Sequence, residues 1–209
     1  TANVMIGLSS SDVNEGTVSP AGVTFTADNW NSPQTVTVSG VNDHMDDGEV
    51  AYAIVTAAAA SADANYNGLN AADLSVTNTD DDTAGITVTP ISGDTSEGGG
   101  TATFTIVLDT QPASDVVIGI SSSDLTEGLV WPATVRFTTA NWNVVRTITV
   151  SGEDDPVDDG DVAFTVFTGA AGSTDANYSG LDAADVSVTN LDNDTAGITV
   201  GAISRNTTE

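Results

Sequence analysis

The sequence predicts an all-β protein built from tandem two-sheet β-sandwiches, and two observations lead to this prediction. Apolar and polar residues alternate with a period of two over many short segments, whereas helical periodicity is nearly absent. The chain also repeats itself at a fixed offset of 112 residues, without insertion or deletion, as Trp142 repeats Trp30. This offset has the length of an ordinary domain and is far longer than a solenoid turn. We therefore expect tandem copies of one β domain.

The second repeat, residues 86–197, is complete and shows the expected strands most clearly. In the segment 101–108, Ala102, Phe104 and Ile106 share one face and threonines occupy the other. We expect strands near 86–90, 101–108, 114–120, 133–138, 145–151, 161–168 and 183–190. About seven short antiparallel strands in a domain of this length are typical of a two-sheet sandwich.

The offset also sets the expected domain boundaries. We expect a first repeat at 1–85, a complete second repeat at 86–197 and the opening strand of a third repeat at 198–209. Because Thr1 corresponds to Ala113, the first repeat lacks the counterpart of residues 86–112, and with it the first two strands. Either the chain is a piece of a longer array, or the open edge is completed by a tail from another molecule. The second interpretation would give head-to-tail fibres by strand addition.

The composition excludes several classes of function. The formal net charge is −27, and the only Lys or Arg side chains are three arginines. Nucleic acids and anionic membrane surfaces bind proteins through Lys and Arg, so we expect neither as a partner. No apolar stretch is long enough to span a bilayer, and the absence of cysteine excludes disulfides and thiolate ligands. No Ser/His/Asp set, phosphate-binding glycine loop or zinc motif is present, so we do not expect an enzyme.

Carboxylates gather at predicted strand ends and recur in both repeats. In the second repeat they lie at Glu97, Asp124, 153–155, 158–161 and 192–194, and in the first at Asp12, 42–43, 46–49 and 80–82. Strand ends of alternate direction meet at one pole of a sandwich, so these clusters can converge. Ionised carboxylates repel one another unless a cation lies among them, and oxygen ligands without cysteine favour Ca²⁺. The alternative is that acidic loops only keep a secreted protein soluble.

Three motifs resemble the Calx-β domain, a module of sodium/calcium exchangers, integrin β4 and very large bacterial surface proteins. They are Asp-Asp-Asp-Thr-Ala-Gly-Ile at 80–86, Thr-Ser-Glu-Gly-Gly-Gly-Thr-Ala-Thr-Phe at 95–104 and the acidic run that ends in Asp-Gly-Asp-Val-Ala-Phe at 154–164. They occur in the family's order, and the resemblance covers both repeats. It implies an immunoglobulin-like sandwich that binds Ca²⁺ at the pole where one domain meets the next.

The resemblance also implies a set of metal ligands, which we carry over by position. In the second repeat the implied Ca²⁺ ligands are Glu97, Asp124, Asp154, Asp155, Asp159, Asp192 and Asp194, and in the first they are Asp12, Asp43, Asp47, Asp80 and Asp82. The chain departs from the family where Asn193 and Asn42 replace aspartates, and these changes would either lower the affinity for the ion or reduce the number of ions held.

Two tryptophans suggest a different function. Trp30 and Trp142 are each flanked by asparagines and could stack on sugar rings, although a buried or edge tryptophan before a strand fits the same pattern. We expect Tyr66 and Tyr178 to pin a long loop onto the sandwich.

Together these observations favour a calcium-stabilised structural or adhesive repeat segment of a large secreted or cell-surface bacterial protein. It would serve as an adhesin stalk, matrix or filament component. Its expected partners are neighbouring repeats of the same chain, a glycan or a host or abiotic surface, and a second copy joined by strand addition from 198–209. The alternative is a carbohydrate-binding accessory module that uses Trp30 and Trp142.

Overall fold

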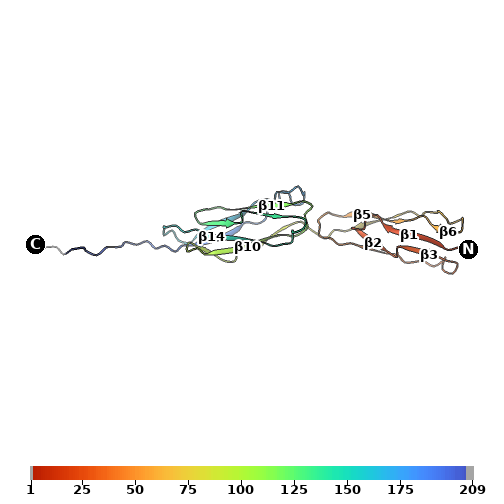
Figure 1. Ribbon diagram of the computed structural model, residues 1–209, viewed down its shortest axis with the longest axis horizontal. Coiled ribbons are helices and arrows are strands. Elements are labelled where there is room, and N and C mark those ends of the chain that lie inside the picture. Colours follow the sequence, from red (N-terminus) through yellow and green to blue (C-terminus); the bar gives the residue numbers. More distant parts are fainter. Residues whose placement is uncertain (1, 206–209) are drawn as a thin grey trace. The chain divides into compact units, whose positions relative to one another are not determined.

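All regular elements of the computed structural model, which describes residues 2–205, are β-strands (Figure 1). The all-β prediction is therefore confirmed. The chain divides into two compact units, Thr1–Thr83 and Ala84–Glu209, called unit 1 and unit 2 below. In the described part of the chain, no helix has the length and hydropathy needed to cross a membrane.

Unit 2 is a sandwich of two sheets. One sheet has the order β12-β14-β10-β8 and is antiparallel throughout: β8 (Ile86–Val88), β10 (Thr101–Leu108), β12 (Gly128–Trp131) and β14 (Arg146–Gly152). The other has the order β13-β11-β15-β16-β9: β9 (Thr95–Ser96), β11 (Val116–Ser122), β13 (Thr134–Phe137), β15 (Val162–Thr168) and β16 (Val186–Leu191). Each strand expected from alternation overlaps an observed strand, whereas β9 and β12 were not expected.

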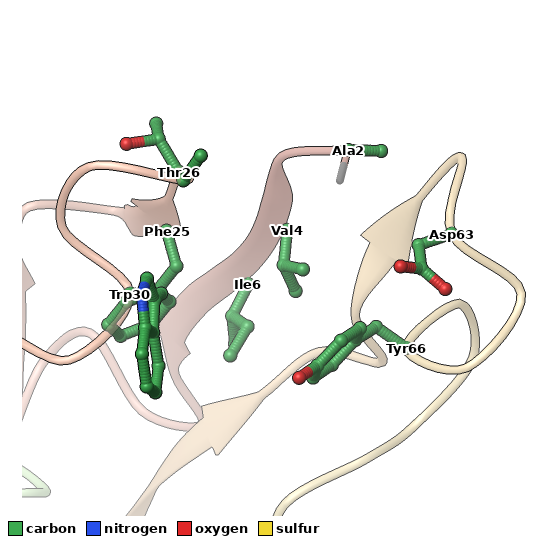
Figure 2. A pocket seen from close by; sticks show the side chains of 9 residues that line it. Ala2, Val4, Ile6, Phe25, Thr26, Trp30, Asp63 and Tyr66 are labelled. Carbon is green, nitrogen blue, oxygen red and sulfur yellow. The ribbon is translucent and has the colours of Figure 1, made fainter.

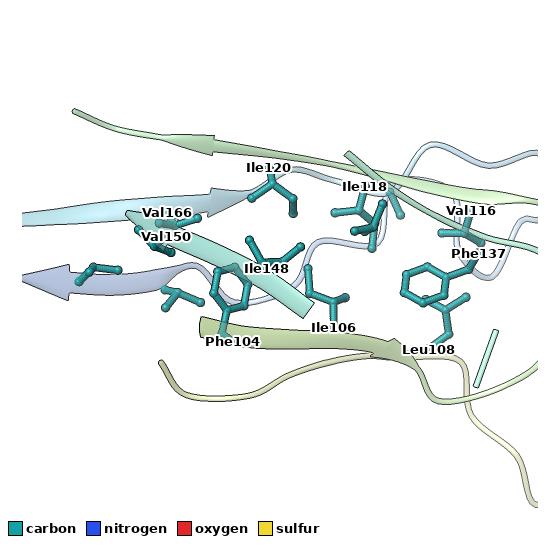
Figure 3. Packing of buried hydrophobic residues seen from close by; sticks show 14 of the residues in the cluster. Phe104, Ile106, Leu108, Val116, Ile118, Ile120, Phe137, Ile148, Val150 and Val166 are labelled. Atoms are coloured by element: carbon teal, nitrogen blue, oxygen red, sulfur yellow. The ribbon is translucent and has the colours of Figure 1, made fainter. Parts of the chain in front are cut away.

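The core of unit 2 lies between the inward faces of its two sheets. Along β10, Phe104, Ile106 and Leu108 are buried, and the residues between them are more exposed. They pack against the alternate residues of the facing sheet, including Ile118 of β11 and Phe137 of β13 (Figure 3). Burial of each such side chain contributes about 1.5–3 kcal/mol to the free energy of unfolding, so this cluster is the main source of stability of unit 2.

Unit 1 repeats part of this arrangement. Its larger sheet has the order β3-β1-β5-β7, with β6 beside β1: β1 (Val4–Ser10), β3 (Gly22–Phe25), β5 (Val50–Thr56), β6 (Ala60–Ser61) and β7 (Leu74–Asn78). Its second sheet is the pair β2 (Gly16–Ser19) and β4 (Thr37–Gly40). At the 112-residue offset β1, β3, β5, β7, β2 and β4 match β11, β13, β15, β16, β12 and β14, whereas β6 matches only the isolated bridge at Gly172. Among the described residues of unit 1, no strand matches β8, β9 or β10.

The described end of the chain, residues 195–205, forms no strand and is exposed. Ile198, Val200 and Ile203 are between 87% and 96% exposed, although their counterparts Ile86, Val88 and Ile91 pack against the core of unit 2. Of the segment expected to open a third repeat, 206–209 lie outside the described residues.

Candidate metal centre

One pole of unit 2 collects acidic loops from several strands. Glu97 directly follows β9, Glu127 directly precedes β12, and Asp192 directly follows β16. The acidic loop 153–161 connects β14 to β15 at the same end. The alternating strand directions therefore bring together carboxylates that lie far apart in the sequence, as the pattern predicts.

The first carboxylate group consists of Glu97, Asp192 and Asp194, each with an oxygen within 4.8 Å of the others. Parallel pairing of β9 with β16 places Glu97 there, and its own N–H donates to the carbonyl of Leu191 at 3.1 Å. Glu97 is only 5% exposed, which is unusual for an ionisable side chain. Its carboxylate accepts a hydrogen bond from the N–H of Asn193 at 3.1 Å.

The pKa values in this group diverge because the three side chains have different hydrogen bonds. The Asn193 N–H lowers the pKa of Glu97, but burial together with the charges of Asp192 and Asp155 raises it above its ordinary value. Burial and the neighbouring carboxylates likewise raise the pKa of Asp194. The pKa of Asp192 is lowered instead, because its carboxylate accepts the N–H groups of Asp194 and Gly160, both at 2.7 Å. The group therefore holds concentrated negative charge that a bound cation would neutralise.

Gly160 has a specific role in this geometry. Its φ of 78° lies in the left-handed region, which turns the acidic loop so that the Gly160 N–H meets Asp192. The same residue type recurs at the matching position of unit 1, where Gly48 has a φ of 77° and donates its N–H to Asp80 at 2.7 Å.

The second group consists of Glu127, Asp155 and Asp159, again with oxygens within 4.8 Å of one another. Glu127 is 6% exposed and accepts a hydrogen bond from Nδ2 of Asn190 at 3.4 Å. Asn190 is itself buried, and its Oδ1 accepts the hydroxyl of Thr95 at 3.0 Å. This chain of hydrogen bonds fixes the buried glutamate against the sandwich.

Glu127 was not among the residues singled out from the sequence. The signal for it was the repetition of Glu15-Gly16 as Glu127-Gly128, three residues after Asp12 and Asp124. A lone glutamate in a turn gives no indication that it will be buried, so only the packing of the sandwich reveals it.

Unit 1 has a matching acidic cleft. Asp80, Asp81 and Asp82 form the third carboxylate group found among the described residues. The cleft is about 20 Å³ in volume, and its other acidic lining residues are Glu15, Asp43 and Asp47. Asn78, the counterpart of Asn190, donates its Nδ2 to Glu15 at 3.2 Å and to the carbonyl of Val41 at 3.0 Å.

The electrostatics of this cleft follow those of unit 2. Burial, with the charges of Glu15 and Asp43, raises the pKa of Asp47. Burial also raises the pKa of Asp82, with a further contribution from Asp81. The N–H groups of Asp82 and Gly48 lower the pKa of Asp80. Both units therefore place one carboxylate of lowered pKa beside others of raised pKa.

Five implied ligands lie outside the three carboxylate groups, and two of these, Asp43 and Asp47, line the acidic cleft of unit 1. Asp12 accepts the N–H of Asn14 at 3.0 Å, and Asp43 accepts the N–H of Met45 at 2.9 Å. Asp154 accepts Nδ2 of Asn193 at 3.3 Å. Asp124 accepts the hydroxyl of Thr126 at 2.6 Å, and this bond is the main reason that its pKa is lowered. Asp12 and Asp124 therefore stabilise their own turns.

The aromatic residues differ between the units. Trp30 is 71% exposed, and together with Tyr66 it lines an apolar groove (Figure 2). Their counterparts are covered, because Trp142 packs against the core and Tyr178 is 1% exposed. Tyr178 donates its hydroxyl to the carbonyl of Thr110 at 2.8 Å, which fixes its loop as expected. The two repeats therefore share no exposed tryptophan platform.

No protein-family model matches this chain, and neither does any curated protein. The donor set is what defines the chemistry of the candidate site. Each of the three groups offers only carboxylate oxygens, which favour hard cations such as Ca²⁺ and Mg²⁺, whereas copper and structural zinc prefer histidine and cysteine ligands.

Proposed function

We propose that this chain is a calcium-stabilised structural or adhesive repeat segment of a large secreted or cell-surface bacterial protein. The observation that carries the proposal is the burial of Glu97 and Glu127 within groups of other carboxylates at one pole of the sandwich. Burying like charges together costs free energy, and a cation among them reverses the sign of that interaction. Both groups consist of carboxylates alone, which suits a structural ion.

Calcium is the cation that suits these groups. It accepts six to eight oxygen ligands in flexible geometry, whereas Mg²⁺ requires a near-ideal octahedron and retains its waters. Carboxylates from four segments gather at the pole of unit 2, at Glu97, Glu127, 153–161 and 192–194, and together they supply many oxygens without symmetric order. The resemblance of the acidic motifs to the Calx-β domain supports the same ion.

The energetic role of the ion follows from linkage. At a free Ca²⁺ concentration 100 times the dissociation constant, each site stabilises the folded state by about 2.7 kcal/mol. This is a large part of the roughly 5–15 kcal/mol that holds a typical domain folded. Extracellular calcium is millimolar, so sites of ordinary affinity would be filled outside the cell. A tandem array stabilised in this way suits a stalk, matrix or filament component.

The test is thermal unfolding of residues 1–209 in EDTA, in millimolar Ca²⁺ and in millimolar Mg²⁺. A Ca²⁺-specific rise of the unfolding midpoint is expected. Glu97→Gln should remove most of the rise in unit 2. Asp182→Asn is the matched control, because Asp182 is exposed, lies outside every group and has Asn70 as its counterpart. An unchanged midpoint in Ca²⁺ would reject the proposal and leave the acidic loops as solubilising surface.

A further inference from the structure

Unit 2 carries an exposed tryptophan that its fold does not require. Trp131 is the last residue of β12 and is 75% exposed. At the repeat offset its counterpart is Ser19, the last residue of β2 in unit 1. In both units this residue lies opposite a threonine of the neighbouring strand, Thr37 of β4 and Thr149 of β14. The same strand pair therefore forms with a serine in this place, so folding does not account for the tryptophan.

Trp131 belongs to the outer face of the sheet β12-β14-β10-β8. In β10 and β14 the inward residues, such as Ile106 and Ile148, fill the core (Figure 3), so the residues that alternate with them face outward. On β12 the same alternation packs Val130 against the core and leaves Leu129 and Trp131 exposed. These two apolar side chains therefore lie on the outer face.

Hydroxyl groups cover most of the rest of this face. Trp131 lies opposite Thr149 of β14, and Thr149 lies opposite Thr103 of β10. The next outward row holds Thr147 of β14 opposite Thr105 of β10. Neighbouring strands lie about 4.7–4.9 Å apart, so rows of hydroxyls extend across the sheet beside the tryptophan.

The face is uncharged, although the chain has 30 Asp and Glu side chains. The only charged residue of β8, β10, β12 and β14 is Arg146, which alternates with the outward threonines and lies 5.6 Å from the centroid of the Phe137 ring. A neutral ligand can approach such a face without electrostatic cost. An anionic ligand is repelled by the net charge of −27.

We propose that the outer face at β12 and β14 binds a neutral polysaccharide. A sugar ring presents a face of C–H groups that stacks on an exposed indole ring, and its hydroxyls exchange hydrogen bonds with threonine hydroxyls. Trp131 is the stacking platform, and Thr149 and Thr147 are the nearest hydrogen-bonding groups. A protein partner fits less well, because the core of a protein interface is more apolar than these rows of hydroxyls.

The inference names a class of target for the adhesive role, and in that respect it rests on the function proposed above. The binding itself does not depend on calcium. Trp131 lies four residues, or about 13 Å of extended strand, beyond Glu127 and outside the three carboxylate groups. Unit 1 has Ser19 in this place and is expected not to bind the sugar at the matching face.

The test titrates the full chain in EDTA with soluble neutral polymers of glucose, mannose, galactose and N-acetylglucosamine, and with anionic polygalacturonate. Saturable binding of at least one neutral polymer is expected, with an affinity that does not change with salt. Trp131→Ser should weaken binding by about tenfold or more, because the aromatic anchor is lost, and should leave amide exchange in β14 unchanged. The matched control Trp30→Ala removes a tryptophan that is 71% exposed in unit 1 and should leave binding unchanged.

Thr149→Val keeps the shape of the side chain and should weaken binding several-fold, because a hydrogen bond is lost. No binding of any neutral polymer, an unchanged affinity in Trp131→Ser, or tighter binding of polygalacturonate than of every neutral polymer would each overturn the proposal. Loss of binding in Trp30→Ala alone would assign the sugar to the apolar groove of unit 1 instead. The two proposals fail separately, since an unfolding midpoint that does not respond to Ca²⁺ would leave these titrations in EDTA unaffected.

Discussion

Units 1 and 2 have nearly the same sequence pattern, yet only one of them closes its core. Ile118 is fully buried in unit 2, whereas its counterpart Ile6 is only half-buried, and Tyr178 is 1% exposed where Tyr66 is 52% exposed. The strands that carry these residues pair in the same register in both units, as β1 with β3 and β11 with β13. The difference shows that alternation suffices to form a sheet, whereas burial requires a facing sheet that includes strands such as β8 and β10.

The largest expected effect concerns a matched pair of phenylalanines, Phe137 in unit 2 and Phe25 in unit 1. Phe137→Ala should cost about 3–5 kcal/mol of the free energy of unfolding of unit 2, because a fully buried ring leaves a cavity. Phe25→Ala should cost unit 1 far less, since Phe25 lines an open groove. Amide hydrogen exchange measured separately in β11 and β1 reports each unit. Equal losses would mean that the groove of unit 1 closes in solution.

Calcium should also act unequally on the two units. At 100 times the dissociation constant, the ion should stabilise unit 2 by about 2.7 kcal/mol per site. Unit 1 should gain less, because among residues 1–83 nothing corresponds to Glu97. Exchange rates of β16 and β7 amides in EDTA and in Ca²⁺ measure both gains. A larger gain in unit 1 would contradict the assignment of Glu97 as a ligand.

A smaller effect is expected from a pair of glycines at the acidic pole. A Cβ at Gly152 would collide with the backbone of Ser96 and with the side chain of Asn190, whereas at Gly40 it would meet only the side chain of Asn78. Gly152→Ala should therefore cost about 1–3 kcal/mol, and Gly40→Ala should cost less because an amide side chain can rotate away. Chemical denaturation followed in each unit measures the two costs. The opposite order would show that β9 does not pack against β14 in solution.

The smallest effect is the response of the ion-free protein to mild acid. Because the pKa values of Glu97 and Asp194 are raised by folding, the folded state binds protons more tightly than the unfolded state. At neutral pH both side chains are ionised and lower the free energy of unfolding. Protonation removes this cost as the pH falls through their raised pKa values, which lie above the ordinary carboxyl range of about 3.9–4.3. In EDTA the unfolding midpoint should therefore rise as the pH falls from neutral towards the ordinary carboxyl range.

At still lower pH the sign reverses, since Asp192 and Asp124 have lowered pKa values and lose their stabilising contribution as they become protonated. In Ca²⁺ the midpoint should fall on acidification from the start, because protons compete with the ion for the same oxygens. Thermal scans across this range in EDTA and in Ca²⁺ measure both curves. Parallel curves would show that the ion does not bind these carboxylates.

Much of the fold could be predicted because its signals are local. The alternation of Phe104 and Ile106 with threonines defined β10, and the same reasoning located the other long strands. Strand β9 escaped prediction because Thr95 and Ser96 pair with residues about a hundred positions further along the chain. The convergence of Glu97 with Asp192 and Asp194 followed from strand ends meeting at one pole.

By itself, the sequence determined the all-β class, the repeat offset of 112 residues and the acidic loops, because each of these depends on residue type and spacing alone. Only the tertiary structure decided which carboxylates are buried together, since Glu127 and Glu97 reach their positions through contacts with β16. It also decided that Trp30 is exposed while Trp142 is partly buried against the core. Whether a side chain is buried depends on which strands of the opposite sheet pack against it, and no local pattern in either repeat encodes that.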